Sequence, residues 1–222
     1  GKFGVVNGPL TSATDCFKIK VKGKGGHSSM PEQCVDPIVA AAQIVMGIQN
    51  IKSRRISAYE TAVISVCKIH GGDAYNIIPE VVEIEGSIRT FSKELRESMP
   101  DMLRQISGGI AASVGAESEV IYERGYSSVV NDDALTNEAR EVIADWFGSE
   151  AVLEIQPVMP GEDFSAFTEA GNCPGCFIEI GTRNPEKGTD KPHHNPKYMM
   201  DEDGLYYGAG FFAAMLEHKL MK

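Results

Sequence analysis

An isolated histidine in a glycine-rich loop is the first candidate for chemistry. His27 lies in the segment GKGGHSS, directly after a stretch in which apolar and polar residues alternate. The preceding glycines let the backbone approach a ligand closely, and an exposed loop imidazole can donate a hydrogen bond to a carbonyl or a developing oxyanion. The competing interpretation is a turn histidine that only packs locally. The spacing alone leaves both interpretations open.

An amide and a guanidinium form a second candidate, a site for a carboxylate. Asn76 ends the glycine-rich segment GGDAYN, and Arg89 lies on the polar side of a predicted strand. A hairpin-like return of the chain would bring the two side chains together, and the fork of an arginine can bind both oxygens of a carboxylate. The alternative is a surface arginine with an Asx turn beside it, which is a common arrangement.

A histidine pair is the third candidate. His193 and His194 precede Asn-Pro and an acidic stretch at 201–203. Neutral imidazole is a standard ligand for zinc or manganese, and a nearby carboxylate can orient it. A catalytic zinc needs at least three protein ligands. Because no HxH, HxxxH or HxD cluster completes such a set elsewhere in the sequence, a self-contained metal site is not expected.

Two further motifs have simpler explanations. Glu162 and Asp163 stand where a predicted strand turns into a helix, so helix capping is favoured over a paired-carboxylate acid–base role. Cys173 and Cys176 form a C-x-x-C motif without the context of a thioredoxin, so a redox role is disfavoured. The remaining two histidines have no supporting partners and are interpreted as structural: His70 and His218.

The elements that must position these residues follow a clear order in the first half of the chain. Alternation predicts strands, and helical spacing after an Asp36-Pro37 start signal predicts the first helix. Pro100 predicts a kink or a late start in the second helix. The predicted elements are strand 16–22, helix 37–48, strand 61–69, strand 81–90, helix 95–110 and strand 120–122. This β-α-β-β-α-β order is the ferredoxin-like pattern, with one antiparallel sheet backed by two helices.

The second half alternates helices with short strands, which predicts an α/β lobe. The predicted elements are helix 135–146 capped by Asp132 or Asp133, strand 152–156, a helix after PGEDF, strand 176–180 and helix 205–221. So few strands cannot complete a parallel sheet, so this lobe is expected to lack elements. Residues 1–10, GKFGVVNGPL, are expected to be a connection without a helix or strand of its own, which hints at truncation.

The composition disfavours several classes of protein. A net charge of −10 argues against nucleic acid, because phosphate contacts need a basic surface. No apolar run approaches the length of a membrane span, and the N-terminus has no signal-peptide pattern. Five cysteines at irregular spacing fit reduced thiols better than a disulfide framework. We therefore expect a cytoplasmic protein with neither a nucleic-acid nor a membrane partner.

Taken together, several segments resemble a family of dimetal metallopeptidases. This family includes aminoacylases, hippurate hydrolases, plant auxin-conjugate (IAA-amino acid) hydrolases and carboxypeptidase-G-like enzymes, and the subgroup acting on N-acyl amino acids is the most similar. The segments occur in the order and spacing of the family. They are VKGKGGHSSMPEQCVDPI, HGGDAYNIIP, EGSIRTF, PGEDFSAF, HHNPKY and DEDGL.

The resemblance implies a fold of mixed class, α+β and α/β. It assigns residues 14–125 to a ferredoxin-like lid that mediates dimerisation. It assigns residues 126–222 to the C-terminal part of a zinc-exopeptidase-type α/β catalytic lobe, and residues 1–13 to the tail of the upstream part of that lobe.

The resemblance also implies roles for individual residues. His27 would reach the active site of the partner subunit and stabilise the oxyanion, Asn76 and Arg89 would contact the carboxylate end of the substrate, and His194 would be the final metal ligand. His193 has less claim to that role. In the family, two divalent metal ions (zinc, manganese or cobalt) and a glutamate activate the attacking water.

The other metal ligands and the glutamate lie upstream of the lid in the family, in a segment that this sequence lacks. The expected function is hydrolysis of the amide bond of N-acyl amino acids or small peptides by a homodimer, with this chain inactive alone. The alternative is a non-catalytic dimerisation or binding module.

Overall fold

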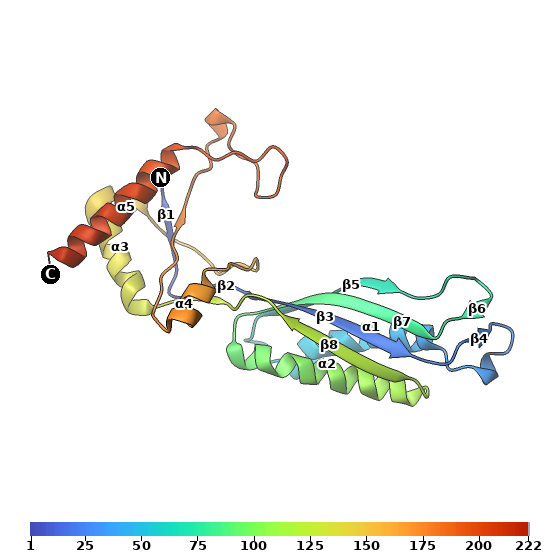
Figure 1. Cartoon of the computed structure of the whole chain (residues 1–222). Coiled ribbons are helices and arrows are strands. Elements are labelled where there is room, and N and C mark those ends of the chain that lie inside the picture. Colours follow the sequence, from blue (N-terminus) through green and yellow to red (C-terminus); the bar gives the residue numbers. More distant parts are fainter. Residues whose placement is uncertain (222) are drawn as a thin grey trace. The chain divides into compact units, whose positions relative to one another are not determined.

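The computed structural model describes residues 1–221, which form two compact units. The central unit comprises Thr11–Ser128 and Met159–Asp163. The terminal unit comprises Gly1–Leu10, Val129–Val158 and the chain from Phe164 onward. Both contain strands and helices, so the fold is mixed α/β (Figure 1).

A four-stranded antiparallel sheet with the order β5-β7-β3-β8 forms the base of the central unit. Its strands are β3 (Ala13–Lys22), β5 (Ala62–His70), β7 (Val81–Thr90) and β8 (Glu117–Arg124). The predicted strand 81–90 is confirmed with both its bounds. β5 is shifted by one residue from the predicted strand 61–69, and β3 and β8 are longer than predicted. Alternation in β3 works as expected, because Phe17, Ile19 and Val21 are buried on one face.

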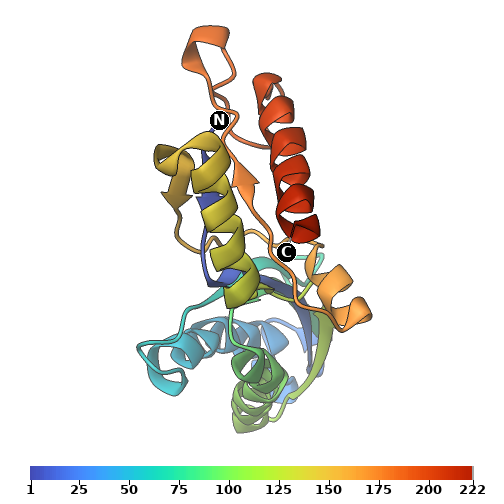
Figure 2. The same cartoon turned by 90° about the vertical axis from the view of Figure 1, so that its left-hand side faces the viewer.

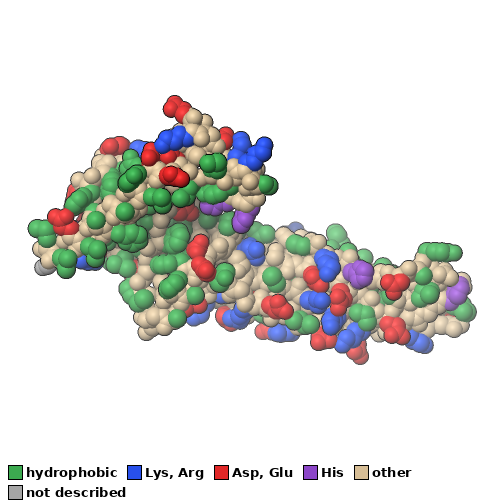
Figure 3. Space-filling model, turned by 45° about the horizontal axis from the view of Figure 1, so that its top comes forward, with side chains coloured by type: hydrophobic (Ala, Val, Ile, Leu, Met, Phe, Trp, Pro, Cys, Tyr) green, Lys and Arg blue, Asp and Glu red, His purple; other side chains and the backbone are tan. Residues whose placement is uncertain are grey.

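The opposite face of this sheet is charged. Lys18 lies 3.2 Å from Glu83 and 3.1 Å from Glu85 of β7, and Lys22 lies 2.7 Å from Glu119 of β8. Acidic and basic side chains are mixed over the surface of the central unit (Figure 3). Opposite charges across neighbouring strands stabilise the sheet modestly and keep this face solvated.

Two helices cover the apolar face of the sheet (Figure 2). In α1 (Pro37–Asn50), the Asp36 carboxylate caps the N-terminus by accepting a hydrogen bond from the Ile38 N–H at 2.8 Å. Their shared core with the sheet contains Ile19, Ile44, Ile48, Ile84, Met99 and Leu103.

The second helix, α2 (Lys93–Ser113), is capped by Ser92 and does not start late at Pro100. It runs through this proline with Met99 and Pro100 both buried. Burial of the apolar helix face outweighs the loss of the single N–H donor that proline lacks.

A small ribbon extends the central unit beyond one end of the sheet (Figure 1). It consists of β4 (Gly26–His27) and β6 (Ile77–Ile78), which pair antiparallel. The short helices η1 (Pro31–Gln33) and η2 (Ile51–Arg55) complete the unit. In chain order the main elements are strand, helix, strand, strand, helix and strand.

A three-stranded sheet with the order β10-β1-β11 forms the centre of the terminal unit. β1 (Phe3–Val5) is parallel to β10 (Val152–Glu154) and antiparallel to β11 (Glu179–Ile180). In addition, β2 (Gly8–Thr11) pairs with β9 (Val129–Asn131). The expectation that residues 1–10 contain no strand is therefore wrong, because Phe3 and Val5 are fully buried in the central strand.

Two helices and several aromatic rings pack against this small sheet. The helices are α3 (Asp133–Phe147) and α5 (Asp203–Leu220). The unit also contains α4 (Ser165–Gly171) and the short helices η3 (Ser149–Ala151) and η4 (Pro185–Lys187). Asp132 caps α3 through the Leu135 N–H at 2.9 Å. The Phe3 ring lies 4.9 Å from that of Phe147 and 5.7 Å from that of Phe211. Within residues 1–221, no helix is both long and apolar enough to cross a membrane.

Candidate functional site

The β4–β6 ribbon brings two of the candidate residues to one tip of the central unit. His27 pairs with Ile77 across the ribbon, and the Ser28 N–H donates to the Asn76 carbonyl at 3.1 Å. His27 and Asn76 therefore lie on adjoining segments although 49 positions separate them in the sequence (76 − 27). Both residues are exposed.

The backbone before His27 is tightly held. A Cβ on Gly23 would lie 2.1 Å from the Val35 carbonyl oxygen, and a Cβ on Gly25 would lie 2.8 Å from that of Ile78. Lys24 and Val35 exchange backbone hydrogen bonds of 2.9 and 3.0 Å. Since only glycine permits this close approach, the GKGG segment fixes the position from which the imidazole projects.

The imidazole of His27 is bound by its own turn. Its Nδ1 lies 3.1 Å from the backbone nitrogen of Ser29 and 2.8 Å from the Ser29 hydroxyl oxygen. The His27 carbonyl accepts a hydrogen bond from the Met30 N–H at 3.0 Å, which closes a four-residue turn. The ring is therefore exposed but anchored.

Arg89 lies far from this tip. It is near the end of β7, in register with Thr14 of β3 and Val63 of β5, and its Nη1 donates to the Ile88 carbonyl at 3.0 Å. Val81 starts β7, so eight residue steps, or about 26 Å of strand, separate it from Arg89. Asn76 precedes Val81 in the chain. The expectation that a hairpin return brings Asn76 and Arg89 together within one chain is therefore wrong.

His194 occupies an unusual backbone conformation in the terminal unit. Its φ is +64°, in the left-handed region that non-glycine residues seldom adopt. It lies in a turn closed by the hydrogen bond from the Asn195 N–H to the Pro192 carbonyl at 3.2 Å. Holding a side chain in such a conformation costs about 1–2 kcal/mol and often marks a functional position.

The neighbouring histidine is engaged elsewhere. His193 Nε2 lies 3.2 Å from the Tyr198 hydroxyl, and the two rings are 4.9 Å apart. For the described part of the chain, no side-chain hydrogen bond of His194 is found, and its side chain is exposed. His193 thus packs against Tyr198, whereas the imidazole of His194 is free to bind a ligand.

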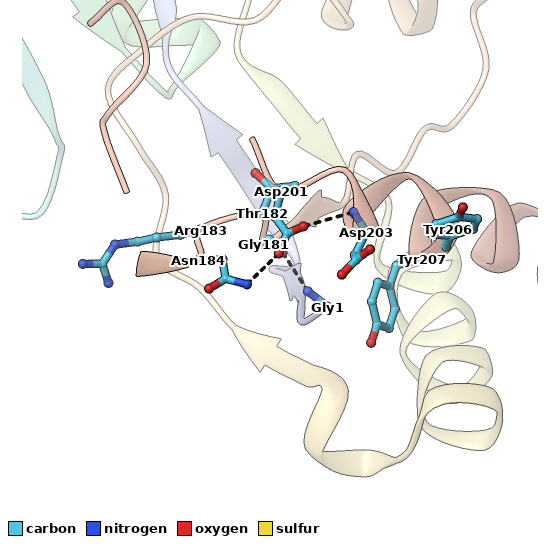
Figure 4. Close-up of a pocket in the computed structure, with 10 residues that line it drawn as sticks. Gly1, Gly181, Thr182, Arg183, Asn184, Asp201, Asp203, Tyr206 and Tyr207 are labelled. Carbon is cyan, nitrogen blue, oxygen red and sulfur yellow. Dashed lines mark hydrogen bonds between the residues drawn. The ribbon is translucent and has the colours of Figure 1, made fainter. Parts of the chain in front are cut away.

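The acidic stretch near this pair binds a lysine. Lys187 Nζ lies 2.7 Å from Asp201 and 2.6 Å from Asp203, and the Asn184 side-chain amide donates to Asp201 at 2.7 Å. The hydrogen bonds from Lys187 and Asn184 lower the pKa of Asp201 to about 2. Both aspartates line a cavity of about 460 Å³ together with Tyr206 (Figure 4). The carboxylates of Asp201 and Asp203 therefore form ion pairs with Lys187.

The described residues do not assemble a metal centre by themselves. Across residues 1–221, no three His, Cys, Asp or Glu side chains are grouped so that they could hold a metal ion. His194 offers one imidazole, whereas a catalytic zinc requires at least three protein ligands. A dimetal centre would need ligands beyond those that this set provides.

The PGED segment precedes α4, whose N-cap residue, Phe164, makes no side-chain capping hydrogen bond. The Glu162 carboxylate accepts a hydrogen bond from the Asp163 N–H at 3.0 Å. Capping of α4 by Glu162 or Asp163 stays a prediction. This segment belongs to the central unit, where the Ser12 hydroxyl donates to the Met159 carbonyl at 2.5 Å.

Within residues 1–221, the cysteines form no disulfide bond. All five are free thiols. Burial raises the pKa of the Cys176 thiol, which also lies 3.4 Å from the Thr136 hydroxyl.

Of the two remaining histidines, His70 is exposed at the end of β5. The sequence predicts no partner for His218, but its Nε2 lies 3.2 Å from a carboxylate oxygen of Glu138.

A buried ion pair escaped the sequence interpretation. Arg96 of α2 holds Asp15 of β3 in a fork, with Nη2–Oδ1 at 2.7 Å and Nε–Oδ2 at 2.9 Å. The Tyr122 hydroxyl and the Gly125 N–H also donate to this carboxylate, at 2.7 and 3.1 Å. Asp15 is 1% exposed and Arg96 8%. Burial and the Asp15 carboxylate raise the pKa of Tyr122, so its phenol remains a donor.

Known proteins resemble this chain along nearly its whole length. Residues 14–114 match the peptidase dimerisation domain. An N-acetylcysteine deacetylase of Bacillus subtilis is 39% identical, over 97% of this chain and 54% of its own. Thermostable carboxypeptidase 1 of Saccharolobus solfataricus is 38% identical, over 94% of this chain and 52% of its own.

A solved structure agrees with these matches. The Bacillus subtilis YXEP protein, described as a dinuclear metal binding peptidase from the M20 family, superposes with a TM-score of 0.78 at 33% identity. The match covers 96% of this chain and 51% of that one. This chain thus spans about half the length of the relatives it matches. The resemblance expected from the sequence is confirmed: residues 14–114 match the dimerisation domain of the M20 peptidases, and nearly the whole chain is similar to a peptidase of the M20 family.

Proposed function

We propose that this chain supplies the lid and part of the catalytic lobe of a metal-dependent amidohydrolase that cleaves N-acyl amino acids or small peptides. The observation that most supports this proposal is the tip of the central unit, where His27 and Asn76 are exposed side by side. Backbone hydrogen bonds hold the two segments together. The deacetylase and carboxypeptidase activities named for the relatives support this substrate class. The element order of residues 14–125 supports a ferredoxin-like lid, with residues 126–222 in the lobe.

The proposed roles require two chains for each site. His27 donates to the oxyanion, Asn76 and Arg89 bind the carboxylate end of the substrate, and His194 is a metal ligand. Because about 26 Å of strand lies between the tip and Arg89, one small substrate cannot touch both within a single chain. In a dimer, the tip of one subunit joins Arg89 of its partner.

We expect the dimer to form through the β5 edge of the sheet. Strand β5 pairs with β7 alone among the described strands, and an edge strand offers unpaired backbone groups to a second copy. Ile69 lies on the helix-covered face of β5 in register with Ile84, yet 54% of it is exposed. A second copy of this edge would cover it.

Ile69→Lys should therefore convert a dimer into a monomer, as measured by light scattering at high micromolar concentration. Glu117→Lys places the same side chain on the opposite edge strand, β8, and should leave the dimer intact. A strict monomer for the unmodified chain at that concentration would contradict the assembly.

Arg89→Ala should lower kcat/KM for substrates that carry a free carboxylate. Loss of a charged hydrogen-bonded contact costs about 1.5–3 kcal/mol in transition-state binding, which lowers kcat/KM by about 10- to 150-fold. The measurement compares a free-acid substrate with its amidated analogue in the full-length enzyme. Equal losses for the two substrates would refute the carboxylate role.

The direct test concerns the 222-residue chain itself. It should hold no dimetal centre after dialysis and should not hydrolyse N-acetyl or N-benzoyl amino acids, because His194 is the single proposed ligand that it provides. Metal analysis and an amidase assay measure this. Two tightly retained divalent ions per chain, or steady turnover, would contradict the proposal.

A non-catalytic dimerisation or binding module is the second candidate, favoured by the match to the dimerisation domain over residues 14–114. The two functions differ when the sequence is assayed within a full-length protein with added zinc, manganese or cobalt. Turnover identifies the enzyme, whereas dimerisation without turnover identifies the module.

A further inference from the structure

We infer that Ser29 is a positioning residue for His27. It holds the imidazole as the tautomer that carries its proton on Nε2, and it aims this N–H away from the lid backbone. The catalytic meaning of the inference rests on the proposed function, whereas the tautomer itself rests on hydrogen bonds alone.

The tautomer follows from what each group is able to donate. A backbone N–H is only a donor, so the Ser29 N–H at 3.1 Å from Nδ1 requires a lone pair on that nitrogen. In a neutral imidazole the proton must then reside on Nε2. The Ser29 hydroxyl, 2.8 Å from the same Nδ1, must likewise act as a donor.

The orientation of the ring follows from the turn. The hydrogen bond from the Met30 N–H to the His27 carbonyl makes His27 the first and Ser29 the third residue of a β-turn. Both polar groups of Ser29 are thereby brought to the Nδ1 edge of the ring. Nε2 lies across the ring from the Cβ attachment, and the side chain is exposed, so the Nε2–H is available to an incoming acceptor.

This arrangement suits an oxyanion donor. An imidazole that could flip, or exchange its proton between the two nitrogens, would present the N–H in only part of the population. Two donors on Nδ1 remove that alternative before substrate arrives, and a preorganised donor needs no reorganisation during the reaction. The neighbouring Ser28 does not contact the imidazole in this way, since its backbone N–H donates to the Asn76 carbonyl.

The first test measures the tautomer in the 222-residue chain by long-range ¹H–¹⁵N correlation NMR, with His27→Gln to assign the signals. We expect a single Nε2–H form at a pH where the ring is neutral. Ser29→Ala should move the Nδ1 resonance towards that of an unbonded imine nitrogen. Ser29→Thr, which keeps the hydroxyl, should restore it, and Ser28→Ala should leave it in place. A proton on Nδ1, or an unchanged resonance in Ser29→Ala, would overturn the inference.

The second test measures activity in the full-length enzyme. Ser29→Ala should lower kcat by about two- to tenfold, the value of one hydrogen bond. The same substitution should have no effect in a His27→Ala background, because Ser29 acts through His27. An equal loss in both backgrounds would show a merely structural role, and an unchanged kcat would refute positioning. If the NMR results hold while His27→Ala is silent, the proposed function fails and the tautomer assignment stands.

Discussion

His27→Ala is expected to lower kcat by about 10²–10³ in the full-length enzyme, the usual cost of removing one oxyanion donor. The imidazole is exposed and lies on a backbone that glycine contacts hold in place, so its removal leaves no cavity in the core. Folding, dimerisation and metal content should therefore be unchanged. His70→Ala is the matched control, because His70 is an exposed histidine of the same unit at the end of β5.

Subunit mixing then tests whether His27 acts on the site of its partner. The roles proposed for His27 and His194 belong to different subunits of each site. A heterodimer of His27→Ala and His194→Ala chains would contain one site with both residues intact. Mixing the two inactive homodimers should restore up to about a quarter of wild-type activity. After random subunit exchange, half of the dimers are heterodimers, and each heterodimer has one intact site out of two. Confirmed subunit exchange without any recovery would exclude action in trans.

The central unit could largely be predicted from sequence because its signals are local. The alternation in β3 and the Asp36 cap of α1 each depend on residues within a few positions. The start of α2 illustrates the limit. Pro100 is a local signal against a helix, but burial of Met99 and Leu103 in the shared core prevails over it.

The errors concern features that only distant residues define. β1 has three residues, too few to display a period, and it is a strand because Val152 and Ile180 lie on either side of it. Asn76 and Arg89 are close in sequence, but an intervening ten-residue strand carries the chain away from the tip. Proximity along a chain indicates proximity in space only across a turn.

The buried ion pair had a detectable sequence signal. Asp15 stands on the same phase of β3 as the buried Phe17, Ile19 and Val21, and Arg96 precedes the buried Met99 by three positions in α2. A charge on an apolar phase implies a partner of opposite charge, since an unpaired buried charge is very costly. Two such charges of opposite sign, in elements expected to pack together, predict a pair.

Arg96→Ala is expected to destabilise the central unit by about 3–5 kcal/mol, because it leaves the buried Asp15 carboxylate without its counter-ion. Arg104→Ala is the control within the same helix. Its ion pair with Asp101 is exposed, so its loss should cost at most about 1 kcal/mol. Replacing both members of the buried pair, as Asp15→Leu with Arg96→Met, should cost less than Arg96→Ala alone, since no charge is then left unpaired.

Urea unfolding can assign this loss to the correct unit. The single tryptophan, Trp146, belongs to α3 in the terminal unit, so its fluorescence reports that unit, whereas circular dichroism reports both. Arg96→Ala should lower the midpoint of the circular dichroism transition and shift the Trp146 transition less. A loss for Arg96→Ala no larger than that for Arg104→Ala would show that the pair contributes no more than a surface contact. The positions of β3 and α2, and through them the β4–β6 tip that carries His27, would then depend on the apolar core alone.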